Sequence, residues 1–329
     1  MTNNLDLVAI GRVGVDIYPT DIGVDLEDVQ AFGKYIGGTA ANVAIAVARY
    51  GHRSALIAKV GNDAFGRYVR RDLAAEFGVN TDFLGTDPNL LTPVTFCAIK
   101  PPEDFPLYFY RSPNAPDMTI SADDILRPDV AYAIQNARVF WSIGSALSAE
   151  PSASALRLAY HLRREFAVPG ACHAVFDLDY RPMFWDSEAD AHRAFAQTLP
   201  YVNVVVGNQK ECAVAVGAGT PDEMADRLLA AGTEIAVVKM GSEGVLGKTA
   251  DERVVVPPVK VETVNGLGAG DAFGGALSHG LLSGWPLERT LSFANAAGAY
   301  VASQIACSSA MPDEATVEDL IARNARSES

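Results

Sequence analysis

Cysteine is scarce in this sequence, and segments suited to export or to a membrane are missing. The four cysteines stand singly, with no spacing that suits a metal site. No uninterrupted apolar run is long enough to span a bilayer. The opening residues, Met1-Thr2-Asn3-Asn4-Leu5-Asp6, lack the basic region and apolar core of a signal peptide. We therefore expect a reduced, cytoplasmic protein.

Positive charge is also in short supply. The chain has 26 lysines and arginines against 40 aspartates and glutamates, for a net charge of −14. General binding of nucleic acid or of an anionic membrane needs basic surface, so this balance argues against both. A small anionic substrate needs only two or three local cations and stays compatible with it. A hydrophobic content of 49% over 329 residues predicts a globular protein with a substantial core.

Several well-known catalytic motifs are absent as well. There is no Gly-x-Ser-x-Gly elbow and no His-Glu-x-x-His, and the five histidines are far apart. Gly247-Lys248-Thr249 resembles the end of a phosphate-binding P-loop, but Ser242 stands where its first glycine is required. Serine hydrolase, zinc protease and P-loop chemistry are therefore not expected.

A glycine-rich stretch near the C-terminal end, residues 264–276, is the most distinctive feature that is present. It contains Gly268-Ala269-Gly270-Asp271 directly before an apolar run with helical spacing. A helix that begins there would present free N–H groups to a phosphate. Asp271 could accept a proton from an attacking hydroxyl, or it could only stabilise the helix dipole. A dinucleotide site would need βαβ units afterwards, which the remaining residues do not predict, so we favour phosphoryl transfer.

Aliphatic runs alternate with helical patterns along the chain, which predicts a parallel sheet covered on both faces. The expected strands cover residues 7–10, 54–60, 139–143, 174–178, 202–206 and 235–239, with a hairpin of 245–246 and 253–256. The expected helices cover residues 43–50, 64–77, 150–166, 188–199, 221–231, 269–283, 287–306 and 313–325. We expect one domain, residues 1–329, with a small β lid built from two insertions, about 13–36 and 92–113.

Polar residues follow the ends of several predicted strands. Asp16 lies just past the first strand, where ligands of open α/β sheets bind, although it could be a solvated loop acid. Gly37-Gly38 and Asn42 open the next helix and could meet a ligand, or form a plain turn. Asn208 and Glu211 share one face of a first helical turn. They could hold water around Mg²⁺, or form a helix cap.

Two signatures together resemble the ribokinase-like (PfkB) family of carbohydrate kinases over essentially the whole chain. The first runs from Gly37 to Ala44 and continues with Gly51 and Gly61; the second is 268–271 with the small residues that follow it. Asn208-x-x-Glu211 lies between them. The resemblance implies an α/β three-layer sandwich with a central, mostly parallel sheet and a β lid, and Mg²⁺-ATP as phosphoryl donor.

The resemblance also implies roles for individual residues. Asp271 matches the catalytic base, and the amides of Gly268, Ala269 and Gly270 match an anion hole. The other matches are sugar contacts at Asp16, Gly38 and Asn42, a Mg²⁺–phosphate motif at Asn208 and Glu211, acting on the metal through water, and an ATP region at Lys239, Gly241, Gly244 and Asn295.

One position departs from the family pattern. Asn265-Gly266 stands where many members have an aspartate followed by threonine or serine. That aspartate often helps to hold a monovalent cation. The resemblance therefore leaves activation by K⁺ open.

Two arginines favour an acidic sugar as the substrate. Arg111 follows the lid run 106–111, and Arg181 lies in Asp177-Leu178-Asp179-Tyr180-Arg181-Pro182. Both would face the sugar cleft, where arginine pairs with a carboxylate through two hydrogen bonds. Each could instead be a surface residue or part of a structural ion pair.

The substrate subclass rests on resemblance within the family. The run 177–185, together with Phe-x-Lys-Tyr-x-Gly-Gly at 32–38, resembles the kinases that phosphorylate the C6 hydroxyl of 5-dehydro-2-deoxy-D-gluconate in myo-inositol catabolism. Kinases of 2-keto-3-deoxygluconate, and then of ketoses, fructose or ribose, are the alternatives. A sugar or nucleotide sensor with the same fold would be free to lose Asp271. Aromatic residues in the lid, namely Phe32, Tyr108 and Phe109, suggest a homodimer through the lid.

Overall fold

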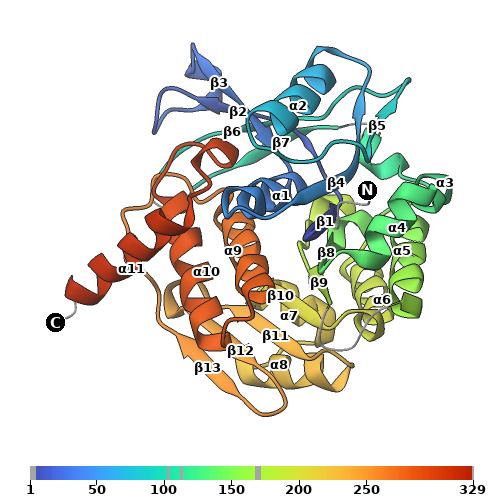
Figure 1. Ribbon diagram of the computed structural model, residues 1–329. Coiled ribbons are helices and arrows are strands. Elements are labelled where there is room, and N and C mark those ends of the chain that lie inside the picture. Colours follow the sequence, from blue (N-terminus) through green and yellow to red (C-terminus); the bar gives the residue numbers. More distant parts are fainter. Residues whose placement is uncertain (1–4, 102–103, 112–113, 167–171, 328–329) are drawn as a thin grey trace.

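A large sheet between two layers of helices forms the body of the molecule, and a smaller sheet lies at one end of it (Figure 1). The computed structural model describes residues 5–101, 104–111, 114–166 and 172–327. The predicted segment 92–113 thus includes four residues, 102–103 and 112–113, that lie outside the described residues.

Nine strands of the described residues form the large sheet, in the order β13-β12-β11-β10-β9-β8-β1-β4-β5. From β5 to β11 neighbouring strands are parallel, and β12 and β13 add an antiparallel hairpin. Their bounds are β1 (Leu7–Ile10), β4 (Ser54–Gly61), β5 (Leu84–Asp87), β8 (Val139–Ile143), β9 (His173–Asp177), β10 (Val204–Asn208), β11 (Ile235–Lys239), β12 (Val245–Lys248) and β13 (Arg253–Val256).

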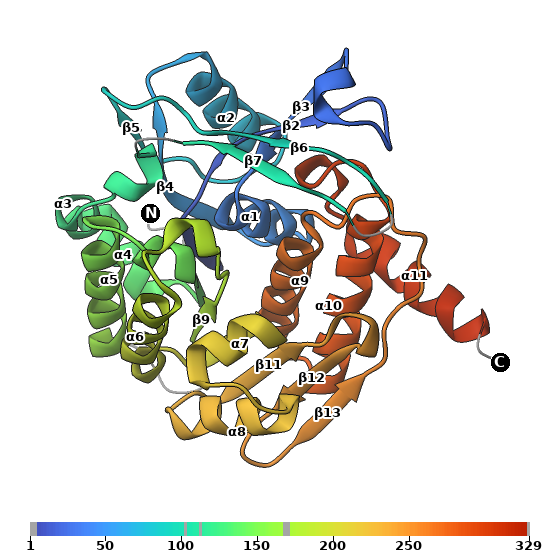
Figure 2. The same cartoon turned by 180° about the vertical axis from the view of Figure 1, so that it is seen from behind.

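The small sheet combines two separate parts of the chain in the order β3-β2-β6-β7. Its bounds are β2 (Gly14–Pro19), β3 (Phe32–Gly37), β6 (Val94–Cys97) and β7 (Leu107–Tyr110). It lies at the top of both ribbon views (Figures 1 and 2).

The helices pack in two groups. Helices α1, α9, α10 and α11 contact one another in succession, and so do α4 with α5, α6 with α7 and α7 with α8 (Figure 2). The bounds are α1 (Thr39–Arg49), α2 (Ala64–Ala75), α3 (Ala122–Leu126), α4 (Pro128–Asn136), α5 (Ser152–Phe166), α6 (Glu188–Thr198), α7 (Gln209–Val216), α8 (Pro221–Ala230), α9 (Ala269–Ser283), α10 (Leu287–Ala302) and α11 (Glu314–Ser327). This three-layer α/β arrangement confirms the predicted fold class.

The order of the strands locates the place where a ligand binds. From β1 the chain continues to β4 and β5 on one side, and then returns to build β8, β9, β10 and β11 on the other side. Strand β1 is therefore the point where the winding of the sheet reverses. In open α/β sheets the crevice at the carboxyl end of that strand is the usual ligand site.

Small residues let α1 and α9 approach closely. A Cβ atom at Gly274 would collide with Trp141, and one at Gly275 would collide with Ala46 of α1. The alanines of α1 and the glycines of α9 therefore have a packing role. Their contact brings the beginnings of the two helices together.

Some predicted boundaries were wrong. The strand expected at 202–206 is β10, two residues later, because the N–H of Val202 donates to Leu199 O and closes a turn. The helix expected to reach residue 306 ends at Ala302, since Ala302 O accepts hydrogen bonds from the backbone N–H groups of Val264 and Asn265 instead. Strand β5 and helices α3 and α4 were not foreseen.

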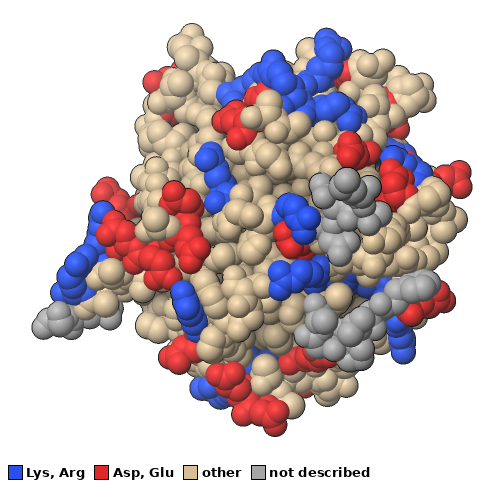
Figure 3. Space-filling model, viewed as in Figure 1, with Lys and Arg blue, Asp and Glu red and all other residues tan. Residues whose placement is uncertain are grey.

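Charge is unevenly spread over the surface. Acidic side chains gather near α11 and basic ones over α2, on a face that is mostly uncharged (Figure 3). All four cysteines are free. Within the described ranges, no helix has both the length and the apolar character needed to cross a membrane.

Candidate active site

A cavity of about 220 Å³ lies between the carboxyl end of β1, the small sheet and the beginning of α9. Its wall includes Asp16, Asn42, Arg111, Arg181 and Asp271. Gly38, Gly268 and Gly270 line it as well. The fold therefore brings the predicted sugar-contact residues, both arginines and the predicted base into one cavity.

Asp271 lies in the first turn of α9, with its carboxylate held by α1. Asn42 Nδ2 donates to Asp271 Oδ2 at 2.7 Å. Burial raises the pKa of Asp271 above its ordinary value, and the hydrogen bond from Asn42 opposes that shift. A carboxylate with a raised pKa is a better proton acceptor than an exposed aspartate.

The backbone just before Asp271 forms an open helix N-terminus. Gly268 has a left-handed φ of 78°, and a Cβ atom there would lie 2.6 Å from Cys307 Sγ, so only glycine fits. Helical hydrogen bonding begins with Ala272 N donating to Gly268 O at 2.8 Å. The N–H groups from Ala269 to Asp271 precede that first bond and are oriented to bind an anion.

Asp16 belongs to a short chain of polar groups on the small sheet. Tyr18 OH donates to Asp16 Oδ2 at 2.7 Å and lies 3.0 Å from Cys307 Sγ. Burial raises the pKa of Asp16 to about 6, although the hydrogen bond from Tyr18 lowers it and the charge of Asp271 adds to it. Gly37 is necessary beside it, since a Cβ atom there would collide with the Asp16 carboxylate.

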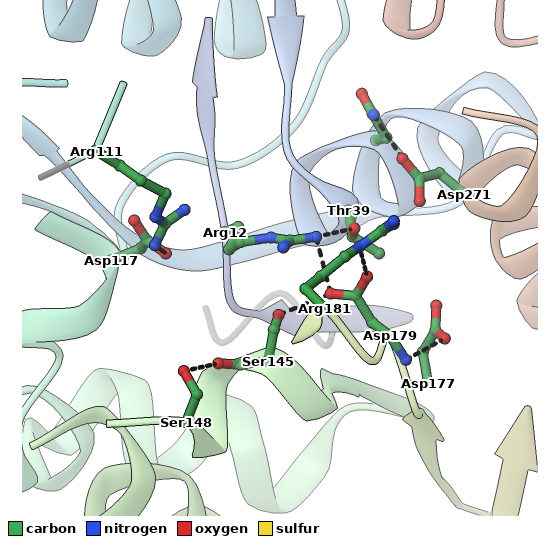
Figure 4. A network of polar contacts seen from close by, with 11 residues as sticks. Arg12, Thr39, Arg111, Asp117, Ser145, Ser148, Asp177, Asp179, Arg181 and Asp271 are labelled. Atoms are coloured by element: carbon green, nitrogen blue, oxygen red, sulfur yellow. Dashed lines mark hydrogen bonds and ion pairs between the residues drawn. The ribbon is translucent and has the colours of Figure 1, made fainter. Parts of the chain in front are cut away.

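Three side chains converge on the buried carboxylate of Asp179 (Figure 4). Arg12 Nη2 lies 2.8 Å from Asp179 Oδ2, Arg181 Nε donates to Asp179 Oδ1 at 2.9 Å, and Ser145 Oγ donates to Asp179 Oδ2 at 2.7 Å. Burial opposes the charge of Asp179, but the two arginines outweigh it and hold the pKa of Asp179 below its usual value. Asp179 also has a positive φ of 31°, a strained conformation of the kind that clusters at functional sites.

Arg111 reaches the cavity from the end of β7. Its Nη2 lies 3.0 Å from Oδ2 of the buried Asp117. The guanidinium groups of Arg111 and Arg12 both stand over the ring of Phe184, at 4.8 and 5.6 Å from its centre. The structural ion pairs that were the alternative for Arg111 and Arg181 are thus present, and both side chains line the cavity as well.

Lys239, the last residue of β11, lies among the carboxylates of Asp271, Asp177 and Glu211. A Cβ atom at Gly270 would lie 3.5 Å from Lys239 Nζ, so the ammonium group stands beside the start of α9. Burial opposes the charge of Lys239, but the carboxylates of Asp177, Glu211 and Asp271 outweigh it and raise its pKa. Burial raises the pKa of Asp177 above its usual range, against the opposing effect of Lys239.

Like Lys239, the remaining residues predicted to bind ATP and Mg²⁺ are not part of the cavity wall. Asn208 and Glu211 form a capping box on α7: Asn208 N donates to Glu211 Oε2 at 2.7 Å, and Glu211 N donates to Asn208 Oδ1 at 3.0 Å. Asn295 Nδ2 donates to Pro257 O at 2.7 Å. Gly241 and Gly244 have positive φ values of 62° and 92° in the turn between β11 and β12.

Arg12, Asp117 and Tyr18 were not foreseen as part of this site. Arg12 carried a usable signal, since it follows β1 and Gly11 directly, at the strand end that also marked Asp16. Tyr18 contacts Asp16 within a strand and Cys307 from the other end of the chain, and Asp117 pairs with Arg111 from a short 3-10 helix that the sequence did not predict. Their place follows only from the fold.

These features define an enzyme class. A carboxylate at a helix N-terminus, a lysine beside it and arginines across the same cavity suit the transfer of a phosphoryl group to a hydroxyl of an anionic molecule.

Comparison with known proteins names the family. Residues 4–314 match the model of the pfkB family carbohydrate kinases, and the chain belongs to this family. It is 34% identical over 325 residues to a 5-dehydro-2-deoxygluconokinase of Photobacterium profundum, covering 96% of this chain and 95% of that protein. It is 31% identical to the enzyme of the same name from Geobacillus kaustophilus, covering 96% and 93%. The predicted sugar kinase family is therefore confirmed.

Solved structures agree on the fold. A candidate ribokinase II from E. coli, in complex with ATP and Mg²⁺, superposes with a TM-score of 0.85 at 24% identity, covering 97% of this chain and 99% of that one. A double mutant of a fructokinase from Vibrio cholerae with fructose, ADP and a potassium ion superposes with a TM-score of 0.83 at 23% identity, covering 98% and 100%. At this level of identity, the likeness concerns the fold.

Proposed function

We propose that the protein transfers a phosphoryl group from ATP to the C6 hydroxyl of 5-dehydro-2-deoxy-D-gluconate. The observation that carries the proposal is one cavity that holds Asp271 at a helix N-terminus and arginines that can pair with the carboxylate of a sugar acid. The names of the two relatives described above support the same substrate.

Asp271 is the proposed base. Its carboxylate accepts the proton of the attacking hydroxyl, and the Asn42 amide keeps it oriented at 2.7 Å. Asp16, Gly38 and Asn42 would bind the sugar hydroxyls from the small sheet and α1. The sugar is thereby held with its reacting oxygen against the start of α9.

Backbone N–H groups and the ammonium group of Lys239 would stabilise the negative charge that develops on the phosphoryl group. The N–H groups from Gly268 to Gly270 precede the first hydrogen bond of α9, and Lys239 Nζ lies beside Gly270. A preorganised set of donors of this kind stabilises the transition state without having to reorient.

The residues proposed for ATP and Mg²⁺ fit that role in their chemistry. Glu211 is buried, and its charge contributes to the raised pKa of Lys239, so the end of β10 and the end of β11 form one polar region. Mg²⁺ keeps most of its water ligands, which suits contact with Asn208 and Glu211 through water. When bound with ATP, the metal neutralises phosphate charge. Gly241, Gly244 and Asn295 would border the nucleotide.

The contacts of Asn265 indicate whether the loop before α9 needs a monovalent cation. This buried side chain uses both polar atoms within the protein: Nδ2 donates to Ile305 O at 2.7 Å, and Oδ1 accepts from Leu267 N at 3.1 Å. The loop before α9 is thereby held by the chain itself. We propose that K⁺ is not required for turnover.

The small sheet is proposed to act as a lid and as a dimer surface. Phe32, Tyr108 and Tyr110 are exposed large side chains on its strands, and a second copy of the chain would cover them. Phe109, which the sequence grouped with Phe32 and Tyr108, is instead half-buried against Phe184 in the cavity wall. Light scattering tests this proposal, and a monomer at micromolar concentration would refute it. We further propose that the protein works in the cytoplasm.

The decisive experiment measures ADP release with a panel of sugar acids and neutral sugars. The proposal expects the highest kcat/KM with 5-dehydro-2-deoxy-D-gluconate. Highest activity with 2-keto-3-deoxygluconate would instead select the second candidate, which the arginines fit equally well. Binding of sugar or nucleotide with no ADP release from any of them would indicate a sensor.

A further inference from the structure

Arg12 has one amino group that nothing in the described structure uses. The residue is only 7% exposed. Its Nη2 is engaged twice, with Thr39 Oγ1 at 2.7 Å and Asp179 Oδ2 at 2.8 Å. Its Nη1 is buried and has no hydrogen-bond partner among the described residues. A buried charged donor without a partner loses its hydration and gains no hydrogen bond in return, so such a group calls for an explanation.

The position of Arg12 in the cavity wall explains its unpaired amino group. Arg12 is part of the cavity wall, and Figure 4 shows it between Arg111 and Asp271 in that view. The three arginines of the wall pair with two aspartates, Asp117 and Asp179. Counted against these direct partners alone, the arginines carry one positive charge more. Asp16 and Asp271 also line the wall, but their carboxylates are hydrogen-bonded to Tyr18 and Asn42, which leaves Arg12 Nη1 available to a carboxylate of the ligand.

The orientation of Arg12 is fixed before any ligand binds. Thr39 and Asp179 hold the Nη2 end, and the Phe184 ring lies 5.6 Å from the guanidinium carbon. Gly38 permits this arrangement, because a Cβ atom there would lie 2.6 Å from the carbonyl oxygen of Arg12. A rigid guanidinium with one free edge is a preorganised donor for a planar anion.

We propose that Arg12 is a specificity-determining residue, whose Nη1 donates a hydrogen bond to the carboxylate of the sugar acid in the cavity. The inference rests on the proposed function and deepens it. It names Arg12, together with Arg111 and Arg181, as the group that selects an acid over a neutral sugar.

The competing explanation is structural. Arg12 could serve only to hold Asp179, with its second amino group bound to a trapped water. The two explanations differ in what a substitution changes. A residue that only holds Asp179 affects all substrates equally, whereas a carboxylate ligand affects the acid alone.

The experiment compares kcat/KM for 5-dehydro-2-deoxy-D-gluconate and for its neutral C1 amide, in the parent enzyme and in Arg12→Lys. Lysine can keep the pair with Asp179 but cannot also place a second donor at the Nη1 position. We expect the ratio of acid to amide to fall about tenfold to a hundredfold, mainly through KM of the acid.

Arg163→Lys is the matched control. Arg163 is another buried arginine, and it donates to the backbone carbonyls of Ile134, Ala137 and His173, away from the cavity. This variant should lose stability while keeping the parent's ratio. Should Arg12→Lys fail to fold, Arg12→Gln combined with Asp179→Asn leaves neither charge buried, and it is compared with Asp179→Asn alone.

The outcomes separate the two levels of the inference. A parent that prefers the acid, with a ratio that falls when Arg12 is replaced and holds in Arg163→Lys, supports the proposal. A parent that prefers the acid, with a ratio unchanged when Arg12 is replaced, overturns the role of Arg12 and leaves the proposed function standing. A parent with no preference for the acid, or with no activity on it, overturns both.

Discussion

Replacing Asp16 with asparagine should stabilise the protein at neutral pH while impairing the proposed reaction. The pKa of Asp16 rises from 3.8 to about 6 because the carboxylate is enclosed next to Asp271. The folded state therefore holds its proton more tightly than the unfolded chain does. Between about pH 4 and 6 the native state binds more protons, so this group's contribution to the stability of the folded state falls as pH rises.

The magnitude follows from the size of the shift. At about pH 7.5 the ionised carboxylate costs the native state at most about 3 kcal/mol, and at about pH 4.5 about 1 kcal/mol. Asp16 faces the cavity, so screening by solvent reduces these values, and we expect a gain of about 1–3 kcal/mol at neutral pH. With an unfolding entropy of about 2.1 cal/mol/K per residue, 329 residues convert the upper value to a rise in Tm of about 4 °C.

The assay is thermal or urea unfolding of the parent and of Asp16→Asn at both pH values. Asparagine keeps the acceptor oxygen for Tyr18 OH, which donates at 2.7 Å to the carboxylate. Packing and hydrogen bonding are thereby conserved, and only the charge is removed. A gain that is equal at both pH values, or a loss of stability at the higher one, would refute the reasoning.

Three further predictions concern catalysis. Asp271→Asn should lower kcat by about two to four orders of magnitude in the ADP-release assay with unchanged folding, and near-normal turnover would rule out Asp271 as the base. Asn42→Ala removes a hydrogen bond that lowers the pKa of Asp271, so the acidic limb of the kcat/KM profile should move to higher pH; a shift to lower pH would contradict this assignment. Replacing K⁺ with a large organic cation should change kcat by less than about twofold, because the Asn265 side chain holds its loop without a cation. A strong dependence of the parent's kcat on K⁺ would contradict this prediction, whereas a dependence that appears only in Asn265→Asp would support it.

The sequence predicted the layered fold well because its signals are local and repeated. Strands such as β8 and β11 are short, mostly apolar runs with the predicted bounds, and the alternation with helices indicates parallel pairing. Helix α9 was also predicted with its observed bounds, since Gly268 and Gly284 frame it. Boundaries failed where distant contacts decide them, as at Ala302, whose carbonyl accepts from the backbone N–H groups of Val264 and Asn265.

The site was predictable only in part. The glycine-rich signatures stood out because phosphate chemistry needs small residues at fixed spacing and because they resemble a known family. The hydrogen bond from Asn42 to Asp271, which joins the two signatures in space, was not predicted. Arg12 was missed although it directly follows a predicted strand, because that position alone does not show which groups the arginine contacts. Its significance depends on Asp179 and Thr39, which lie 167 and 27 positions away in the sequence.

Under the proposed role of the arginines, the two sheets share the task of choosing a substrate. Arg12 and Arg181 follow strands β1 and β9 of the large sheet, whereas Arg111 follows β7 of the small sheet. Asp179 pairs with the first two, and Asp117 holds the third separately. No ion pair among the described residues connects the two halves of the cluster. A bound carboxylate that contacts both halves supplies that connection, so recognition of the acid and contact between the sheets over the sugar would be one event.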